Sequence, residues 1–165
     1  QTDVADNDFN LLELQGEPFR FRIGKKMWFA TKVKTNDADD GELVVGLGIA
    51  TAVILTTLPT DGLFFSKTET ATRMDFHARK DSVSTQLTGI DPTVLADNAT
   101  REYAFYIDET GKVSVYVDWV LAGTVAAGNT NMPDDEDLHF MIGNQTGAAD
   151  AHTLHCDYVI IVQEF

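Results

Sequence analysis

Hydrophobic and polar residues alternate in short runs along most of the chain, and this period of two limits the folds open to it. In residues 27–35, for example, Phe29 and Val33 fall on one face and Lys32 and Lys34 on the other. Alternation of this kind is typical of strands that bury one face. It recurs in residues 9–14, 18–23, 63–66, 73–79, 82–88, 102–108, 113–118, 119–125, 138–143 and 153–163.

One further run, residues 42–49, is apolar almost throughout, so we expect this strand to be covered on both faces. Its two glycines, Gly46 and Gly48, have no phosphate-binding pattern around them, and we expect them to let a neighbouring chain approach closely.

Turn-forming residues separate the runs. Hairpins are predicted at Lys80 and Asp81 and at residues 109–112, and Asp118 and Trp119 lie at a third turn. Many short strands without helices between them predict an all-β fold, a two-sheet antiparallel jelly-roll sandwich of the concanavalin A-like kind.

The composition is even and the turns are short, so one domain over residues 1–165 is predicted, with the polar residues 1–8 as a flexible N-terminal arm. Residues 51–58 are compatible with one or two helical turns, and residues 91–98 with a loop that contains a single helical turn.

The formal net charge of −14, from 26 acidic and 12 basic residues, weighs against nucleic acid and anionic membranes as partners, because both would repel the chain. No stretch reaches the roughly 20 apolar residues of a membrane-spanning helix. The single cysteine, Cys156, lies in an alternating run, so we expect a buried, inert thiol.

Catalytic patterns are missing from the sequence. A retaining glycosidase needs two carboxylates about 5 Å apart, and the Glu-x-Asp-x-x-Glu strand signature is absent. The acidic residues gather in turns instead, at 37–40 and 134–137, where they are usually solvated. No Gly-x-Ser-x-Gly occurs, and the histidines have no metal-ligand spacing. We therefore predict no catalytic residues, no enzyme activity and no cofactor.

Two features remain as candidate binding sites. Asp37, Asp39 and Asp40 form an acidic turn whose oxygens could ligate calcium, although it does not match the twelve-residue EF-hand loop. Trp119 lies at a turn, where we expect its indole to be exposed and able to contact a ligand. The other candidate aromatic residues lie within strands, where we expect most to pack into the core: Trp28, Tyr103, Tyr106, Tyr116 and Tyr158.

Several segments, in this order, resemble concanavalin A-like and laminin-G-like jelly rolls. They are residues 28–34, 44–48, 61–67, 103–108, 113–118 and 155–164. More narrowly, they look like a group of tailed-phage virion proteins with that fold. The family usually has Asp-Gly after the Val-Tyr-Val strand, whereas this chain has Asp118-Trp119, which puts the turn geometry in question.

The resemblance implies a non-enzymatic capsid decoration, cement or head-fibre protein on the virion surface. Its partners would be the major capsid protein and further copies of itself. The alternative is a lectin-like module that binds host-surface glycans, and a more remote alternative is a glycoside hydrolase, because this fold carries all three functions.

Overall fold

The computed structural model describes residues 9–49, 57–147 and 151–165. These residues form eleven strands in two antiparallel sheets and contain no helix, so nothing helical is available there to cross a membrane. One sheet has the order β1 (Phe9–Glu13), β10 (His139–Thr146), β3 (Gly41–Gly48), β4 (Gly62–Lys67), β5 (Asp75–Lys80) and β6 (Val83–Leu87). The other has the order β11 (Leu154–Gln163), β2 (Met27–Thr35), β7 (Thr100–Ile107), β8 (Val113–Val117) and β9 (Val120–Val125).

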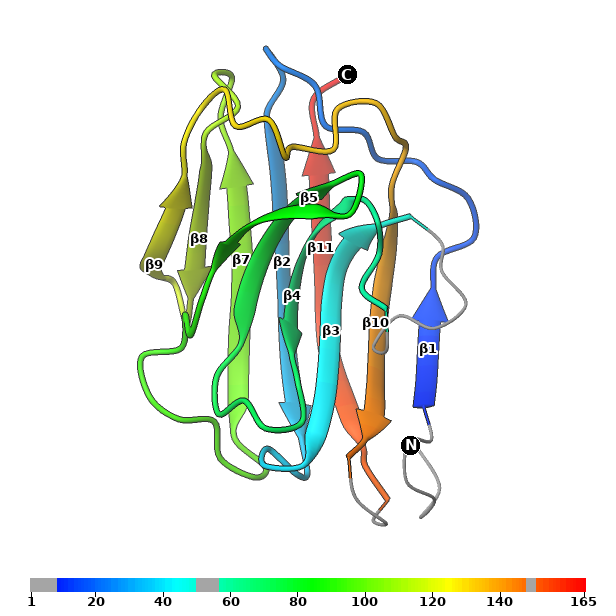
Figure 1. Ribbon diagram of the computed structural model, residues 1–165, viewed down its shortest axis with the longest axis vertical. Coiled ribbons are helices and arrows are strands. Elements are labelled where there is room, and N and C mark those ends of the chain that lie inside the picture. The colour runs from blue at the N-terminus through cyan, green and yellow to red at the C-terminus, as the bar shows by residue number, and fades with distance from the viewer. Residues whose placement is uncertain (1–8, 50–56, 148–150) are drawn as a thin grey trace.

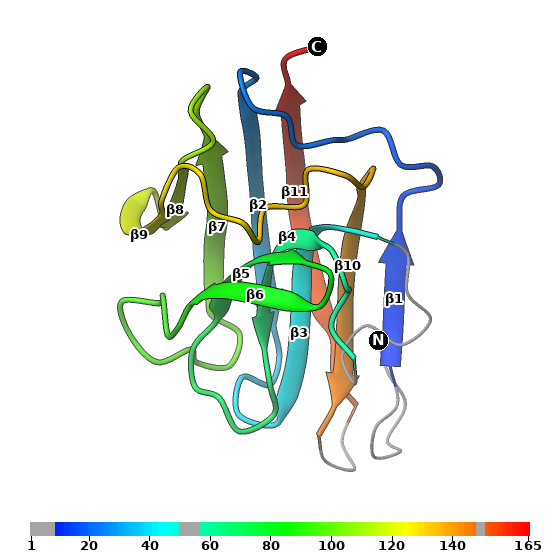
Figure 2. The same ribbon diagram turned by 45° about the horizontal axis from the view of Figure 1, so that its top comes forward.

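The two sheets pack face to face as the layers of a sandwich (Figure 1), and the turned view keeps them apart as two layers (Figure 2). Consecutive strands β1, β2 and β3 alternate between the sheets. The pairs β1–β10, β10–β3, β11–β2 and β2–β7 join distant parts of the sequence, whereas β3 to β6 and β7 to β9 are consecutive antiparallel strands. This is a jelly-roll sandwich, and the predicted fold class is confirmed.

The core between the sheets is built from every second residue of the strands. Phe29 on β2 stacks on Phe105 on β7, with ring centroids 5.0 Å apart, and Phe65 on β4 meets Phe76 on β5 edge to face at 5.2 Å. All four rings are fully buried. Aromatic and β-branched side chains of this kind fill a sandwich interior because they stand off a pleated sheet and interdigitate.

Strand β3 is covered on both faces, as its apolar run predicts. Val44 faces away from the main core and is still fully buried in a second cluster with Phe64 and Met141. Gly46 permits this packing, because a Cβ at that position would lie 2.5 Å from the Cα of Phe64. The close approach expected of this glycine is confirmed.

The predicted hairpins are present, and their geometry is that of tight turns with positive φ. Asp81 and Ser82 join β5 to β6 with φ values of 50° and 68°. Asp118 and Trp119 join β8 to β9 with φ values of 49° and 65°, so the turn is kept without the glycine that the resembling family carries. Such turns match the right-handed twist of paired strands.

Three expectations of local structure are wrong. Residues 18–23 form no strand, because only Phe19 pairs, in a single bridge with Leu138, and the chain then turns at Gly24, whose φ is 85°. Residues 91–98 contain no helical turn. The thiol of Cys156 is exposed, not buried. The helical alternative for residues 51–58 and the arm at 1–8 lie outside the described residues, except for residues 57 and 58.

Candidate functional site

Trp119 lies on the surface of the hairpin between β8 and β9, with 53% of its side chain exposed. The turn is held by Asp118, which accepts a hydrogen bond from the backbone N–H of Glu102 at 3.0 Å and one from the Arg101 guanidinium at 3.1 Å. The Asp118 N–H in turn donates to the Glu102 carbonyl at 2.8 Å. The hairpin tip is therefore fixed to strand β7, and so is the position of the indole.

Trp119 belongs to a group of four aromatic residues on the outer face of the five-stranded sheet, which we name the aromatic platform: Trp28, Tyr106, Tyr116 and Trp119. The two indoles are nearly parallel, with an interplanar angle of 11° and centroids 6.0 Å apart. The rings of Tyr106 and Tyr116 each lie 5.9 Å from Trp28 and are tilted against it. Trp28, on strand β2, therefore lies next to each of the other three aromatic residues.

Small residues beside the platform make room for these rings. Ala30 and Ala104 pair with each other across β2 and β7 on the outer face of the sheet. Their exposed fractions are only 1% and 4%, so larger neighbouring side chains cover both methyl groups. These two small residues thus lie on the same face of the sheet as the platform.

Apolar and charged residues border the platform. Leu121 on β9 and Ile160 and Val162 on β11 are exposed to solvent. Along the strands, Lys32 lies 3.8 Å from a carboxylate oxygen of Glu102, at the distance of a partly screened ion pair. The outer face therefore combines stacking surfaces with polar groups that could orient a ligand.

A buried polar network supports the hairpin from inside. Asp91 accepts hydrogen bonds from the Tyr103 hydroxyl at 2.8 Å and from the Met74 N–H at 2.6 Å, and the Arg101 Nε lies 3.9 Å from it. Burial raises the pKa of Asp91, although these donors and the nearby guanidinium oppose the rise. Burial also raises the pKa of Tyr103 well above its ordinary value, and the Asp91 carboxylate adds to it. Arg101 thus links this network to Asp118 and the turn.

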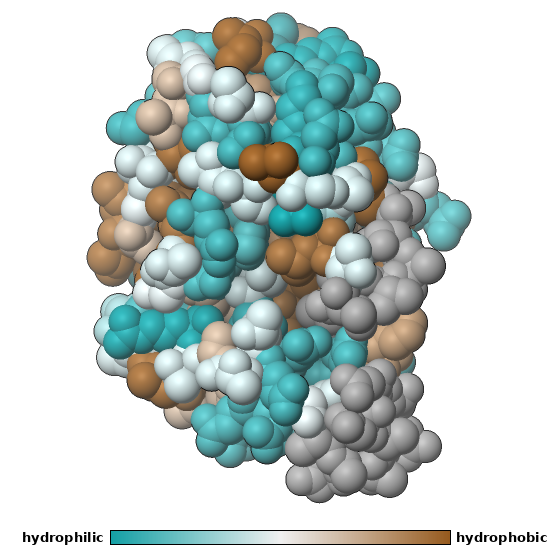
Figure 3. Space-filling model, viewed as in Figure 1, coloured by the Kyte–Doolittle hydropathy of each residue, from teal (hydrophilic) through white to brown (hydrophobic). Residues whose placement is uncertain are grey.

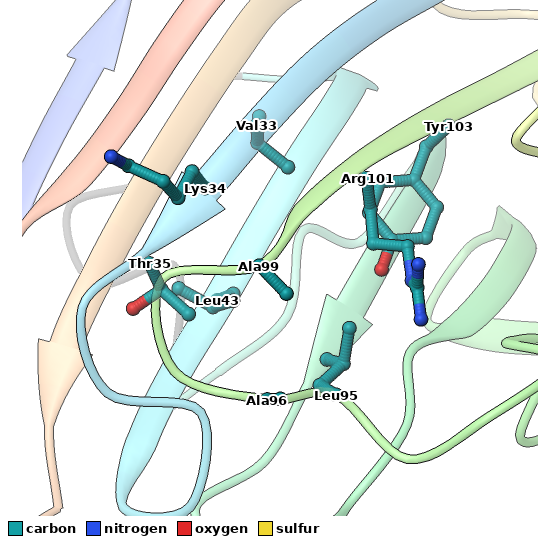
Figure 4. A pocket seen from close by; sticks show the side chains of 9 residues that line it. All are labelled: Val33, Lys34, Thr35, Leu43, Leu95, Ala96, Ala99, Arg101 and Tyr103. Atoms are coloured by element: carbon teal, nitrogen blue, oxygen red, sulfur yellow. The ribbon is translucent and has the colours of Figure 1, made fainter.

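The cavity beside this network is too small for a ligand. It lies between residues 95–99 and strands β2 and β7, where Figure 4 shows Arg101 and Tyr103 among mostly apolar side chains. Its volume of about 20 Å³ leaves room for little more than one water molecule. The network therefore has a structural role.

The proposed calcium turn is occupied by groups of the chain itself. Asp37 accepts hydrogen bonds from the N–H groups of Asp39 and Asp40 at 3.1 Å each, and its other oxygen lies 3.2 Å from His152. The Lys67 ammonium donates to the carbonyl of Asp39 and to two further carbonyl oxygens nearby, at 3.3, 2.8 and 3.2 Å. Burial lowers the pKa of Lys67, and the surrounding carboxylates oppose this. A cation of the chain thus lies among the oxygens expected to ligate calcium, and calcium binding stays a prediction.

The other acidic turn forms ion pairs at the surface. Asp134 and Asp135 contact the Lys80 ammonium at 2.5 and 3.0 Å, and Asp137 lies 3.3 Å from the Arg20 guanidinium. Within the described residues, no group of three or more His, Cys, Asp or Glu side chains could hold a metal ion.

The visible part of the outer face of the six-stranded sheet carries many hydrophilic residues, as Figure 3 shows. Phe64 is fully buried and stacks on His77 at 5.0 Å, and Ser66 lies 2.9 Å from the His77 Nε2. Burial lowers the pKa of His77 to about 4. The one exposed ring among the described strand residues of this face is Phe9 on the edge strand β1, which is 41% exposed and has no aromatic partner among the described residues.

Of the aromatic candidates from the sequence, Tyr103 is in the core as expected. Trp28, Tyr106 and Tyr116 are half-buried on the outer face, so the expectation of core packing is wrong for them. Their alternation with Phe29, Phe105 and Val115 already placed them on the opposite side of their strands.

No protein-family model and no curated protein sequence matches this chain. Among solved structures, the carbohydrate recognition domain of Emp47p is similar over 97% of this chain and 80% of its own, with a TM-score of 0.65 and 12% identity. An endo-1,3-β-glucanase from Streptomyces sioyaensis is similar over 93% of this chain and 69% of its own, with a TM-score of 0.65 and 12% identity. Sheep galectin-11 is similar over 96% and 98%, with a TM-score of 0.50 and 13% identity. The chain thus shares the jelly-roll fold of concanavalin A-like and galectin-like domains.

Proposed function

We propose that this chain is a carbohydrate-binding module that takes neutral glycans on the aromatic platform. The observation that carries the proposal is the pair of parallel indoles, Trp28 and Trp119, at the surface of the five-stranded sheet. The C–H groups of a pyranose ring carry slight positive charge, and the face of an indole is negative, so the two pack favourably.

The surroundings of the platform favour a neutral ligand. The net charge of −14 would repel sialylated, sulfated or uronic acid-rich chains. Near the indoles, Asp118 and Glu102 add carboxylates, which accept hydrogen bonds from sugar hydroxyls. The similarity to a carbohydrate recognition domain and to a galectin supports the same function through the fold. A ligand held on the exposed face of a sheet should bind weakly, and several copies of the module together would bind it more tightly.

The intrinsic fluorescence of the protein tests this proposal directly. The chain has two tryptophans, and both belong to the platform, so a bound sugar changes the signal at its source. We expect a set of neutral oligosaccharides, titrated one by one, to include at least one that shifts the emission saturably. Sialylated and sulfated versions of that sugar should not shift it.

Substitution separates the platform from the rest of the surface. We expect Trp119→Ala to weaken binding of that sugar at least about tenfold by calorimetry, as buried aromatic anchors of binding sites commonly do. The matched control is Val83→Ala on β6, an exposed apolar residue of the other sheet, which should bind as the parent does. No saturable response to any neutral glycan would sink the proposal, and so would full binding by the Trp119 variant.

A virion decoration role is the second candidate, and the exposed apolar residues Leu121, Ile160 and Val162 support it, because they could bury against a shell protein. None of the similar structures named above is a phage protein, so the capsid partner, self-association on the shell and the virion location stay predictions. Saturable co-sedimentation with empty expanded capsids, at a fixed ratio to the major capsid protein, is the expected result. The glycoside hydrolase alternative predicts release of reducing sugar from β-1,3-glucan.

A further inference from the structure

The two sheets do not match in width, and this leaves a groove at one side of the sandwich. Strand β1 is the sixth strand of its sheet, whereas the facing sheet ends at β11. Figures 1 and 2 both show β1 lying outside β11. Leu12 pairs with Ile142, whose side chain belongs to the core, yet Leu12 itself is 66% exposed. The core-facing side of β1 therefore has no strand opposite it.

A cavity of about 310 Å³ occupies this position, and we name it the inter-sheet groove. Its apolar walls include the side chains of Leu12, Ile142 and Leu154, and its polar residues are Asn10, Asn144 and Cys156. None of the described residues that line it carries a charge. The size is at the lower end of small-molecule sites, and the lining favours a neutral, mostly apolar occupant.

The side chain of Asn144 has an unpaired hydrogen-bond donor at the groove. Its side chain is 4% exposed, and within the described residues its amide nitrogen, Nδ2, has no hydrogen-bond acceptor. Buried donors are nearly always paired, because leaving one unpaired costs free energy. A donor in this state, at the wall of a cavity, calls for an acceptor oxygen from a ligand.

Cys156 lies in the same groove, at an irregularity of strand β11. The pairing of β11 with β2 shifts register between Cys156 and Tyr158, and such bulges commonly redirect side chains at binding sites. The thiol is exposed, and its Sγ lies 3.4 Å from the Tyr158 carbonyl and 3.6 Å from the Thr31 hydroxyl. It is the only cysteine of the chain, so any thiol chemistry reports on the groove.

We infer that the inter-sheet groove binds a small neutral molecule with an apolar body and one carbonyl or hydroxyl oxygen. The apolar body lies against Leu12, Ile142 and Leu154, and the oxygen accepts a hydrogen bond from Nδ2 of Asn144. The bound molecule covers the Cys156 thiol. This site is on the opposite side of β11 from the outer face that carries the platform, so it stands or falls independently of glycan binding.

Alkylation of Cys156 by iodoacetamide measures occupancy, since the sulfur–carbon bond forms as iodide leaves and mass spectrometry counts the adduct. The probe is hexanamide, which has an alkyl chain and a carbonyl oxygen. Protonated hexylamine is the matched probe, with the same chain and no acceptor. We expect hexanamide to slow alkylation saturably at concentrations on the order of millimolar, as suits a fragment of this size. Hexylamine should slow it much less.

The Asn144→Leu variant tests the hydrogen bond itself. Leucine has a similar size and no donor, so the fold should persist, which the unfolding temperature checks. We expect the half-protecting concentration of hexanamide to rise about fivefold to tenfold in this variant, the usual value of one hydrogen bond. Absence of protection in the parent protein overturns the inference. Equal protection by hexylamine, or by hexanamide in the variant, also overturns it, because either result means unspecific adsorption.

Discussion

Acid should destabilise this protein through His77, by an amount that follows from its surroundings. The imidazole is 4% exposed, between the ring of Phe64 and the hydroxyl of Ser66. Burial lowers its pKa from 6.5 to about 4, although Asp75 favours the charged form, while Arg79 adds to the lowering. The folded state therefore holds a neutral imidazole in the range where the unfolded chain takes up a proton.

The sign of the effect follows from this difference. Stability from the neutral imidazole is fully present above pH 6.5 and is lost as the pH falls from 6.5 to about 4. The difference between the two pKa values corresponds to about 3 kcal/mol of folding stability. About 2 kcal/mol of this stability is lost between pH 7 and pH 4.5. Carboxylates also titrate in this range, so the parent protein alone cannot isolate the His77 contribution.

A comparison with His77→Gln isolates it. Glutamine can keep a hydrogen bond to Ser66 and does not titrate, so the variant should lose less stability on acidification than the parent by about 2 kcal/mol. The assay is urea unfolding at pH 7 and at pH 4.5, followed by far-ultraviolet circular dichroism. Equal losses in both proteins would show that His77 is protonated without cost in the fold and would refute the reasoning.

Three further substitutions give expected outcomes. In Trp119→Gly, relief of the positive φ and loss of the stack on Trp28 should nearly cancel, so the unfolding free energy changes by less than about 1 kcal/mol in urea while glycan binding is lost. In Gly46→Ala, the Cβ meets the backbone of Phe64, so stability should fall by at least about 3 kcal/mol, measured in the same way. Lys67→Met leaves three carbonyls without their ammonium donor and should cost about 2–3 kcal/mol, measured in the same way.

The alternation of side chains was enough to predict the sheets and most strands. The alternation gave a wrong prediction for residues 18–23, which alternate with a period of two but have no neighbouring strand to pair with. Phe21 is buried there, while Ile23, on the same side by parity, is 62% exposed. A strand exists only where another backbone offers partners, and turns at Gly16 and Gly24 carry this segment past the sheet edge. The local sequence cannot predict whether such a partner strand exists, because the partner would come from a distant part of the chain.

Cys156 shows the same limit for burial. Its pairing opposite Val33 places it on the core-facing side of β11, as the alternation predicted. It is nevertheless exposed, because β11 is the edge strand of its sheet and β1, the edge strand of the other sheet, lies beyond it and not opposite it. The odd or even position of a residue along a strand tells which face of the sheet its side chain lies on. Whether another strand covers that side chain depends on the width of the opposite sheet.

The candidate site was partly readable from the sequence. The turn at Trp119 was identified from the sequence, but Trp28, Tyr106 and Tyr116 were expected in the core, although their alternation with core residues puts them on the other face of their strands. The meeting of these four residues depends on the pairing of β2, β7 and β8. The register that sets Trp28 beside Tyr106 joins residues far apart in the chain. No short-range pattern fixes such a register.

The backbone at Trp119 is the strongest physical argument for a role in binding. A positive φ of 65° is comfortable for glycine and costs a bulky residue about 1 kcal/mol or more. An indole in that position also remains 53% exposed, so burial recovers only part of what a tryptophan can contribute to folding. Its stack on Trp28 offsets the strain without exceeding it by much. The proposed glycan site would use this strained, half-exposed tryptophan, because a ligand on the platform would cover its free face.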